Sequence, residues 1–509
     1  MKKKTIDLGE KKQELLEVLQ EQGEYIPAYC GGVGKCGKCK VRFSGQAPEP
    51  TENEVRCLTK KEREEGWRLA CEVEVSGEIS IELPDYQTED RILVETEWKT
   101  EEILADPAVF CEKEAEKAQM EKGHAEAAPG DAGDAVVAVD IGTTTIVASA
   151  ISQAKKTVEK TVSGINHQRL FGADVISRIE ASNQGKGEEL QKLICHDLKG
   201  LVEDLGLCFE KTPMIISGNT TMQHLLQGYS CQTLGVAPYT PVDISFHSYK
   251  NMKILPGVST YVGADIVSGI IACQMDQKKE ISLLVDIGTN GEMAIGNKNQ
   301  ILATSTAAGP ALEGGNISCG MAGIPGAISS VSIENGKIEM QTIGNQKPVG
   351  ICGTGVLETV YELCKAEIMD KTGRLDKKYV KEGFPLTKDI AFLQKDIREV
   401  QLAKAAIRAG IEILVKEFGV DLDQIDQVYL AGGFGQKINV DKAVGIGMIP
   451  EELAGKIVAV GNSSLAGAVM LAKTPHLEER FRKAAENARE ISLAKNAEFY
   501  KLYIKYMSL

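Results

Sequence analysis

The sequence contains one short phrase twice, and this repetition limits the folds that the chain can adopt. An apolar run ending in Asp140 is followed by Ile-Gly-Thr, and a second apolar run ending in Asp286 is followed by the same three residues. Each phrase reads as a buried strand, a tight turn and two further strands. The chain is therefore predicted to contain two related halves, at about residues 134–275 and 280–475, with Asp140 and Asp286 in equivalent places.

The turns that follow these two aspartates have the composition of phosphate-binding loops. Their glycines permit close approach of the backbone to phosphate oxygens, and their hydroxyl and amide side chains add hydrogen-bond donors. The two aspartates can hold a hydrated magnesium ion. Two such loops facing each other would clamp a nucleotide. The predicted phosphate-binding residues are Gly142, Thr143, Thr144, Thr145, Gly288, Thr289 and Asn290.

A third glycine-rich motif follows a short apolar strand in VYLAGGFGQKINV. Because glycine has no side chain, an adenosine ring could lie there against bare backbone. The residues assigned to this contact are Gly432, Gly433, Phe434 and Gly435. Other glycine-rich stretches, around residues 309–323 and 353–355, are expected to line the same cleft, with Glu313 as a candidate second carboxylate. Cys319 and Cys352 are predicted to be buried thiols.

The motifs DIGTTT, DIGTNGE and LAGGFG occur in the order typical of the actin-like ATPase superfamily, which includes sugar kinases and chaperone ATPases. The resemblance runs from Asp134 to about Lys473, where GNSSLAGAVMLA is similar to the second connecting helix. It implies a duplicated ribonuclease-H-like fold that binds ATP. Sugar kinases of the superfamily place a catalytic Asp in a context like that of Asp265, which implies a base or a water-orienting group. The alternative is a helix cap, since Asp is common before a helix.

The N-terminal region carries a glycine-rich loop with three cysteines, YCGGVGKCGKCKVRFSG. A plant-type 2Fe-2S cluster takes three thiolates from one such loop and the fourth from far along the chain. Cys30, Cys36 and Cys39 are the loop ligands. For the fourth, Cys71, at the entry to an alternating strand, is preferred to Cys57, which lies in a charged stretch predicted to be helical. A zinc site is the alternative, since C-x2-C is half of a zinc knuckle, but a second close pair is missing.

The residues around the cysteine loop predict a small ferredoxin domain of the β-grasp type. Residues 2–8 are expected to form a strand, and residues 11–22 a short helix with one leucine-rich face. The C-x5-C spacing departs from the plant pattern and resembles that of adrenodoxin-like ferredoxins. The predicted organisation is a 2Fe-2S ferredoxin domain at 1–85, an acidic linker at 86–133, and an actin-like ATPase domain at 134–509 with a C-terminal helical segment.

Composition excludes several classes of protein. The N-terminus lacks the apolar run of a signal peptide and no segment is apolar for long enough to span a bilayer, so a cytoplasmic protein is predicted. Thirteen cysteines in that compartment favour metal ligation over disulfides. A net charge of -14 disfavours nucleic acid, because phosphate binding depends on Lys and Arg. The excess of acidic residues within 86–133 fits a solvated, flexible linker.

A C-x5-C-x2-C ferredoxin, an acidic linker and an actin-like ATPase together resemble the ATP-dependent reductive activators of corrinoid proteins. The phrases SGNTTMQHLLQG, NHQRLFGADVISRI and ICGTG are similar to that family as well. The resemblance implies transfer of one electron from the cluster to Co(II) of a cobalamin-type methyltransferase system, which regenerates Co(I). It also implies ATP, Mg²⁺ and an upstream low-potential electron donor.

Two other functions remain open on sequence alone. One is an activator of the hydroxyacyl-CoA dehydratase type, in which cysteines of the ATPase domain bridge a cluster between two subunits. The other is a small-molecule kinase with a regulatory cluster. The sequence leaves the corrinoid partner, the electron donor and the oligomeric state, including a homodimer, unassigned.

Overall fold

The computed structural model describes residues 1–9, 12–22, 24, 26, 32, 34, 37–84, 135–172 and 174–509. Cys30, Cys36 and the predicted linker at 86–133 lie outside these residues. Within them, no helix is both long and apolar enough to cross a bilayer.

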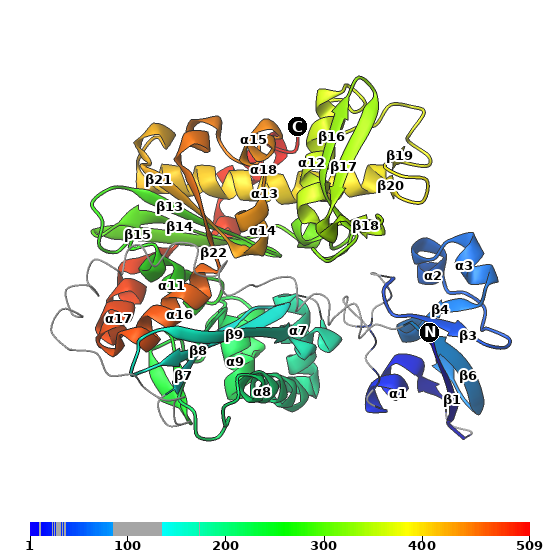
Figure 1. Cartoon of the computed structure of the whole chain (residues 1–509), viewed down its shortest axis with the longest axis horizontal. Coiled ribbons are helices and arrows are strands. Elements are labelled where there is room, and N and C mark those ends of the chain that lie inside the picture. The colour runs from blue at the N-terminus through cyan, green and yellow to red at the C-terminus, as the bar shows by residue number, and fades with distance from the viewer. Residues whose placement is uncertain are drawn as a thin grey trace.

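The N-terminal domain is a small sheet with one helix packed against it (Figure 1). The sheet has the strand order β1-β6-β3-β4, and β6 pairs antiparallel with both of its neighbours. The helix buries Leu15, Leu16 and Leu19 in the domain core, which confirms the predicted leucine-rich face. The elements are β1 (Lys2–Asp7), β2 (Gln13–Glu14), α1 (Leu15–Glu21), β3 (Lys40–Phe43), α2 (Glu52–Cys57), α3 (Lys60–Glu64), β4 (Trp67–Leu69), β5 (Glu74–Val75) and β6 (Glu78–Leu83).

Two details of this domain differ from the prediction. The helix expected from residue 11 begins at Leu15, because Gln13 and Glu14 pair with β5 instead. Cys71 does not enter a strand: it lies in a single 3-10 turn, Ala70–Glu72, directly after β4. Cys57 is the last residue of α2, as its charged surroundings predicted.

The rest of the chain is built on two six-stranded sheets in which five strands share one topology. The sixth strand differs, since β11 lies beside β12 in the first sheet and β23 lies beside β15 in the second. The first has the order β11-β12-β10-β7-β8-β9, and the second β22-β21-β13-β14-β15-β23. In each sheet, three strands that are consecutive along the chain pair antiparallel: β7, β8 and β9 in the first, and β13, β14 and β15 in the second. Two later strands extend the sheet in parallel from the free edge of the first strand: β10 and β12 from β7, and β21 and β22 from β13. The duplicated fold predicted from the repeated phrase is confirmed.

The strands of the first sheet are β7 (Ala135–Ile141), β8 (Thr145–Ser152), β9 (Val158–Ile165), β10 (Met214–Gly218), β11 (His247–Tyr249) and β12 (Met252–Ile254). Those of the second are β13 (Ser282–Ile287), β14 (Asn290–Asn297), β15 (Gln300–Ala307), β21 (Gln427–Ala431), β22 (Ile457–Gly461) and β23 (Ala488–Glu490). A further small sheet and a hairpin comprise β16 (Ala327–Glu334), β17 (Lys337–Thr342), β18 (Gly350–Ile351), β19 (Phe384–Pro385) and β20 (Ala391–Phe392).

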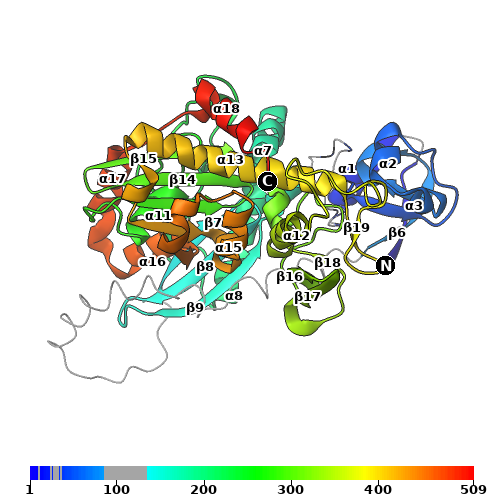
Figure 2. The same cartoon turned by 90° about the horizontal axis from the view of Figure 1, so that it is seen from above.

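Helices fill the space between the two sheets and cover their outer faces (Figures 1 and 2). Between the sheets, α11 packs directly on α16, and their apolar residues share one core with both sheets. The outer face of the first sheet packs against α7, α8 and α9, and that of the second against α12 and α13. These alternating faces follow from the two-residue period of a strand, as in β7, where Val137 and Val139 face outward and Ala138 inward.

The helices of this region are α7 (Val175–Ala181), α8 (Gly187–Asp204), α9 (Thr220–Gln227), α10 (Gln232–Gly235), α11 (Ala264–Ala272), α12 (Gly353–Lys365), α13 (Gln394–Phe418), α14 (Gly432–Lys437), α15 (Val440–Gly445), α16 (Ser463–Lys473), α17 (Glu478–Asn487) and α18 (Ala497–Lys505). The C-terminal α18 lies along α13 (Figure 2).

Candidate nucleotide and iron-sulfur sites

Asp140 and Asp286 occupy the same place in the two halves, as the repeated phrase predicted. Each is the last but one residue of the first strand of its sheet, directly before a phosphate-type loop. Burial raises the pKa of Asp286 to about 8, and the nearby Asp265, Asp140 and Glu313 carboxylates act in the same direction. The fold thus brings acidic residues of both halves into one site.

Asp265 is the second residue of α11, and the cap position belongs to Gly263. The alternative view of Asp265 as a helix cap is therefore wrong. Its Oδ1 accepts a hydrogen bond from the amide of Ile266 at 2.8 Å. Burial raises the pKa of Asp265 to about 7, with a contribution from Asp140. A carboxyl group with such a pKa is half ionised near neutral pH, which suits acid-base chemistry.

Glu292 is a further carboxylate of the site that the sequence reasoning did not identify. It lies on β14 directly opposite Asp286 in the antiparallel register. Burial raises its pKa well above the usual value, and the negative charges of Asp265, Asp286 and Asp140 act in the same direction. The available signal was its position in DIGTNGE, two residues past the second loop and on the strand that must pair with Asp286.

Asp140 is held by residues from the other half of the chain. Asn462 Nδ2 donates to its Oδ2 at 2.8 Å, and Ser464 Oγ donates to its Oδ1 at 2.6 Å. Asn462 also caps α16 by accepting from the amide of Leu465 at 2.7 Å. Burial raises the pKa of Asp140, and these two hydrogen bonds oppose the rise. The sequence reasoning placed GNSSLAG on a connecting helix but gave Asn462 and Ser464 no role.

The first loop turns tightly between β7 and β8. The amide of Gly142 donates to the Thr145 carbonyl at 3.0 Å, and a Cβ on Gly142 would lie 2.6 Å from that oxygen, so only glycine fits. Asn166 Nδ2 donates to the Gly142 carbonyl at 2.9 Å, and the Arg178 guanidinium donates to the Thr143 carbonyl. Neither Asn166 nor Arg178 was predicted to support the loop.

The second loop contacts Glu313, the carboxylate predicted beside it. Thr289 Oγ1 donates to Glu313 Oε2 at 3.2 Å, and a Cβ on Gly288 would lie 3.2 Å from Glu313 Oε1. Burial raises the pKa of Glu313, while the hydrogen bonds from Thr289 lower it. The amide of Gly288 donates to the Asn290 carbonyl at 3.1 Å, which closes the turn.

The third glycine motif begins where β21 ends and adjoins the second loop. Gly432 has a φ of 84°, and a Cβ there would lie 2.7 Å from Asp286 Oδ1. Gly433 is exposed, whereas Gly435 and the Phe434 side chain are buried. Phe434 therefore belongs to the core of the second half. At this position a nucleotide could contact the backbone but not the aromatic ring.

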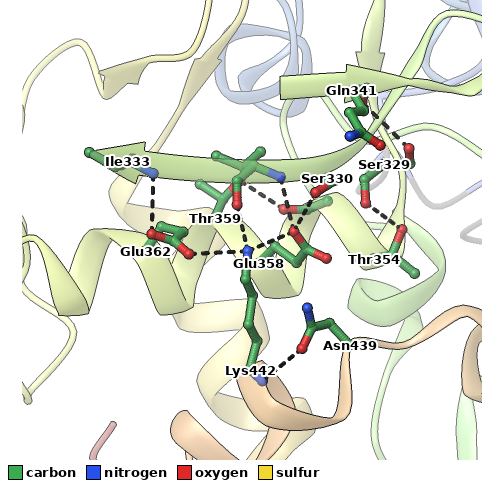
Figure 3. A network of polar contacts seen from close by, with 12 residues as sticks. Ser329, Ser330, Ile333, Gln341, Thr354, Glu358, Thr359, Glu362, Asn439 and Lys442 are labelled. Carbon is green, nitrogen blue, oxygen red and sulfur yellow. Dashed lines mark hydrogen bonds and ion pairs between the residues drawn. The ribbon is translucent and has the colours of Figure 1, made fainter. Parts of the chain in front are cut away.

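A buried ion-pair network fixes the segment that follows this motif (Figure 3). Lys442 Nζ on α15 donates to the Val331 carbonyl at 2.7 Å and to Glu358 Oε2 at 2.8 Å, and lies 3.1 Å from Glu362 Oε1. Glu358 also accepts from Ser330 Oγ at 2.8 Å. Lys442 thus joins the third glycine motif to α12 and β16.

Of the cysteines proposed as cluster ligands or alternatives, the structure describes Cys39, Cys57 and Cys71. Cys39 Sγ and Cys71 Sγ are 3.3 Å apart and both residues are buried, a separation within reach of a single metal ion. Cys57 Sγ lies 3.5 Å from the Gly34 carbonyl. Three loop glycines have a positive φ: Gly32, Gly34 and Gly37. The described thiols therefore fit a cluster that Cys30 and Cys36 would complete.

Comparisons with known families divide the chain in the same places as the fold. Residues 2–76 match the 2Fe-2S iron-sulfur cluster binding domain. Residues 135–278 match the RACo middle region, and residues 280–509 match the C-terminal domain of RACo, the ASKHA domain. The chain belongs to the RACo family. The predicted resemblance is thus confirmed, and this RACo-family protein carries a 2Fe-2S domain and an ATP-binding ASKHA domain.

Several known proteins resemble this RACo-family chain. It is 33% identical over 376 residues to the corrinoid activation enzyme RamQ of Eubacterium limosum, a match that covers 65% of this chain and 63% of that protein. It is 28% identical to a Co(II) methylated amine-specific corrinoid protein reductase of Methanosarcina barkeri, over 65% of this chain and 68% of that one. A solved structure titled as a reductive activator for corrinoid, iron-sulfur protein matches with a TM-score of 0.66 and 28% identity, over 99% of this chain and 96% of the other.

Proposed function

We propose that this protein is an ATP-dependent reductive activator of a corrinoid protein. It passes one electron from its 2Fe-2S cluster to inactive Co(II) and so regenerates Co(I) for methyl transfer. The observation that carries the proposal is the presence, on one chain, of the Cys39 and Cys71 thiol pair and of a site where Asp140, Asp265 and Asp286 converge. The activities named for the relatives support it.

Cys30, Cys36, Cys39 and Cys71 would hold the cluster. The cluster supplies a one-electron carrier of low potential. Burial of Cys39 and Cys71 keeps water from that edge of the site. Backbone amides of the glycine-rich loop would stabilise the negative charge of the sulfurs. A corrinoid protein is the proposed electron acceptor and a separate low-potential protein the proposed donor.

The two repeated loops would bind the phosphates of ATP, and the third glycine motif the adenosine. Asp140 and Asp286 would hold a hydrated Mg²⁺, whose charge would keep both carboxylates ionised. Asp265, with its pKa near neutral, is the proposed group that orients the attacking water or accepts its proton. The proposed phosphate contacts are Gly142, Thr143, Thr144, Thr145, Gly288, Thr289 and Asn290, and the proposed adenosine contacts are Gly432, Gly433, Phe434 and Gly435.

The proposal explains why both domains belong on one chain. Reduction of Co(II) by a ferredoxin-type cluster is uphill, and each ~100 mV of uphill one-electron transfer requires about 2.3 kcal/mol. Binding of ATP can supply this energy if it favours a state of the complex in which reduction is easier. We propose that three regions share this work, with the ferredoxin domain at 1–85, the linker at 86–133 and the ATPase domain at 134–509.

The test is conversion of Co(II) to Co(I) in corrinoid proteins, followed by absorbance with a chemical reductant present. The wild type should convert its partner only when ATP and Mg²⁺ are added. Asp286→Asn should abolish this ATP-dependent conversion while the reduced cluster keeps its paramagnetic resonance signal. Asp389→Asn, a change at an exposed aspartate, is the matched control and should behave as wild type. Conversion by Asp286→Asn at the wild-type rate would contradict the proposal.

A further inference from the structure

Three successive carbonyl groups of the first phosphate loop, those of Gly142, Thr143 and Thr144, accept hydrogen bonds from Asn166 and Arg178. Asn166 Nδ2 donates to the Gly142 carbonyl at 2.9 Å, and the Arg178 Nη2 group donates to the Thr143 carbonyl. The backbone amide of Asn166 donates to the Thr144 carbonyl at 2.9 Å. Three successive carbonyls thus point toward Asn166 and Arg178.

This arrangement fixes the direction of the loop amides. In a trans peptide unit the C=O and N–H bonds point in opposite directions. The amide of Thr143 shares a peptide with the Gly142 carbonyl, and the amide of Thr144 shares one with the Thr143 carbonyl. Both amides are therefore turned away from Arg178, and successive amides that point to one side form a concave anion-binding site.

Asn219 orients the Thr143 side chain so that it too can donate a hydrogen bond on the outer side of the loop. Asn219 Oδ1 caps α9 by accepting from the amide of Met222 at 3.0 Å, so its Nδ2 is the group that faces Thr143. This Nδ2 donates to Thr143 Oγ1 at 3.1 Å. Since the hydroxyl oxygen accepts from Asn219, its proton can be donated to a ligand on the outer side of the loop.

Arg178 has no exposed surface, and it binds uncharged acceptors. Besides the Thr143 carbonyl, its Nε donates to the Gly172 carbonyl at 2.9 Å and its Nη1 lies 3.1 Å from the Met222 sulfur. Over the described part of the chain, no carboxylate forms an ion pair with Arg178. A buried cation without a directly paired anion is unfavourable by itself, so an anion bound at the loop would stabilise it.

The charges around Arg178 leave it protonated at neutral pH. Burial, and then the neighbouring Arg169, lowers the pKa of Arg178 to about 9, whereas Asp174 and Asp197 act in the opposite direction. The guanidinium therefore places a positive charge directly beneath the loop, on the side opposite to the amides.

We propose that Arg178 is a positioning residue for the phosphate groups of a nucleoside triphosphate. It holds the Thr143 carbonyl inward, which turns the loop amides outward, and its charge is balanced by the bound polyphosphate. The inference rests on the proposed function of this loop in nucleotide binding and assigns that function a residue outside the three motifs.

The test compares affinities of the full-length holoprotein for Mg·ATP and for AMP by titration calorimetry. Arg178→Gln should lower the ratio of ATP to AMP affinity about tenfold or more, because the positive charge beneath the loop is removed and the Thr143 carbonyl is no longer held inward by the guanidinium. The matched control is Arg482→Gln, since Arg482 also donates to a main-chain carbonyl, that of Phe246 at 2.9 Å, but on α17. This control should keep the wild-type ratio.

A wild-type ratio in Arg178→Gln would overturn the inference, even if both affinities fell, because a general loss of structure weakens both nucleotides alike. If Arg178→Gln does not fold, Arg178→Lys keeps the charge but loses the planar fork, and should lower the ratio about threefold; an unchanged ratio would again overturn the inference. Failure of the wild type to bind ATP at all is distinguishable, since it would instead reject the proposed nucleotide function.

Discussion

Asp286 and its neighbours hold protons at pH values where carboxyl groups in water have lost them. The pKa of Asp286 is raised from 3.8 to about 8 by burial and by the nearby carboxylates. The folded protein without ligands therefore binds a proton that the unfolded chain releases, and stability must fall as the pH rises. A bound cation would remove this penalty.

We therefore expect the thermal midpoint of the ligand-free protein to fall as the pH rises from about 5 to about 8, by about 5 °C or more. Asp286→Asn should reduce this dependence, because the amide cannot titrate. Scanning calorimetry without Mg²⁺ or nucleotide measures it, with Asp389→Asn as the control. A midpoint that rose with pH in the wild type would contradict the burial of these carboxyl groups.

The two candidate fourth ligands of the cluster also differ at the scale of single residues. Cys71 Sγ lies 3.3 Å from Cys39 Sγ, whereas Cys57 Sγ faces the Gly34 carbonyl. We expect Cys71→Ser to lose most of the 2Fe-2S absorbance and paramagnetic resonance signal, and Cys57→Ser to retain both. Retention of the cluster by Cys71→Ser and its loss in Cys57→Ser would transfer the role to Cys57.

At the scale of elements, the strands were easier to predict than the contacts among them. The apolar runs before Asp140 and Asp286 are long, and each ends in a glycine turn, so the two hairpins followed from local pattern alone. Asn462 and Ser464 could not be assigned in this way, because they are polar residues that meet Asp140 only after the two halves have packed together.

The same reason explains other residues that the sequence did not reveal. Arg178 lies on the short helix α7, and its buried state depends on the first phosphate loop and on α9, which it contacts only in the folded chain. Glu292 required the register of β13 and β14 to be known. A charged residue in a sequence is usually exposed, so its burial is visible only in three dimensions.

The network of Lys442 is a property of elements, because it joins α15, α12 and β16. Lys442→Met would leave the Glu358 and Glu362 carboxylates buried without a cation, and we expect a loss of about 3–5 kcal/mol of stability. Denaturant unfolding measures it. Lys483→Met breaks an exposed pair with Glu479 and should change stability by less than about 1 kcal/mol. Equal effects of the two changes would contradict the structural role of Lys442.

At the scale of the whole molecule, the two halves meet through α11 and α16 at very short range. A Cβ on Gly467 of α16 would lie 2.4 Å from the Ser268 carbonyl oxygen of α11. These helices therefore touch backbone to backbone, and we expect any motion between the halves to pivot on this contact.

We expect Gly467→Ala to separate α11 from α16 and to weaken ATP-dependent activation at least several-fold, with a lower thermal midpoint. Gly200→Ala is the matched control: Gly200 also lies inside a helix, α8, but a Cβ there meets nothing within 4 Å. This control should be slightly more stable than the wild type, since alanine favours helix. Wild-type activation by Gly467→Ala would show that the contact does not govern the motion.

The hydrogen bonds from Asn462 and Ser464 to Asp140 also have a consequence for the synthesis of the protein. Asn462 and Asp140 are 322 residues apart in the chain. At roughly 5–20 residues per second, the ribosome needs on the order of 15–65 s to reach Asn462 after it has added Asp140. Throughout that interval the nascent chain has a finished ferredoxin segment but an unfinished nucleotide site. A chain cut short by interrupted translation would therefore lack the two side chains that hold Asp140.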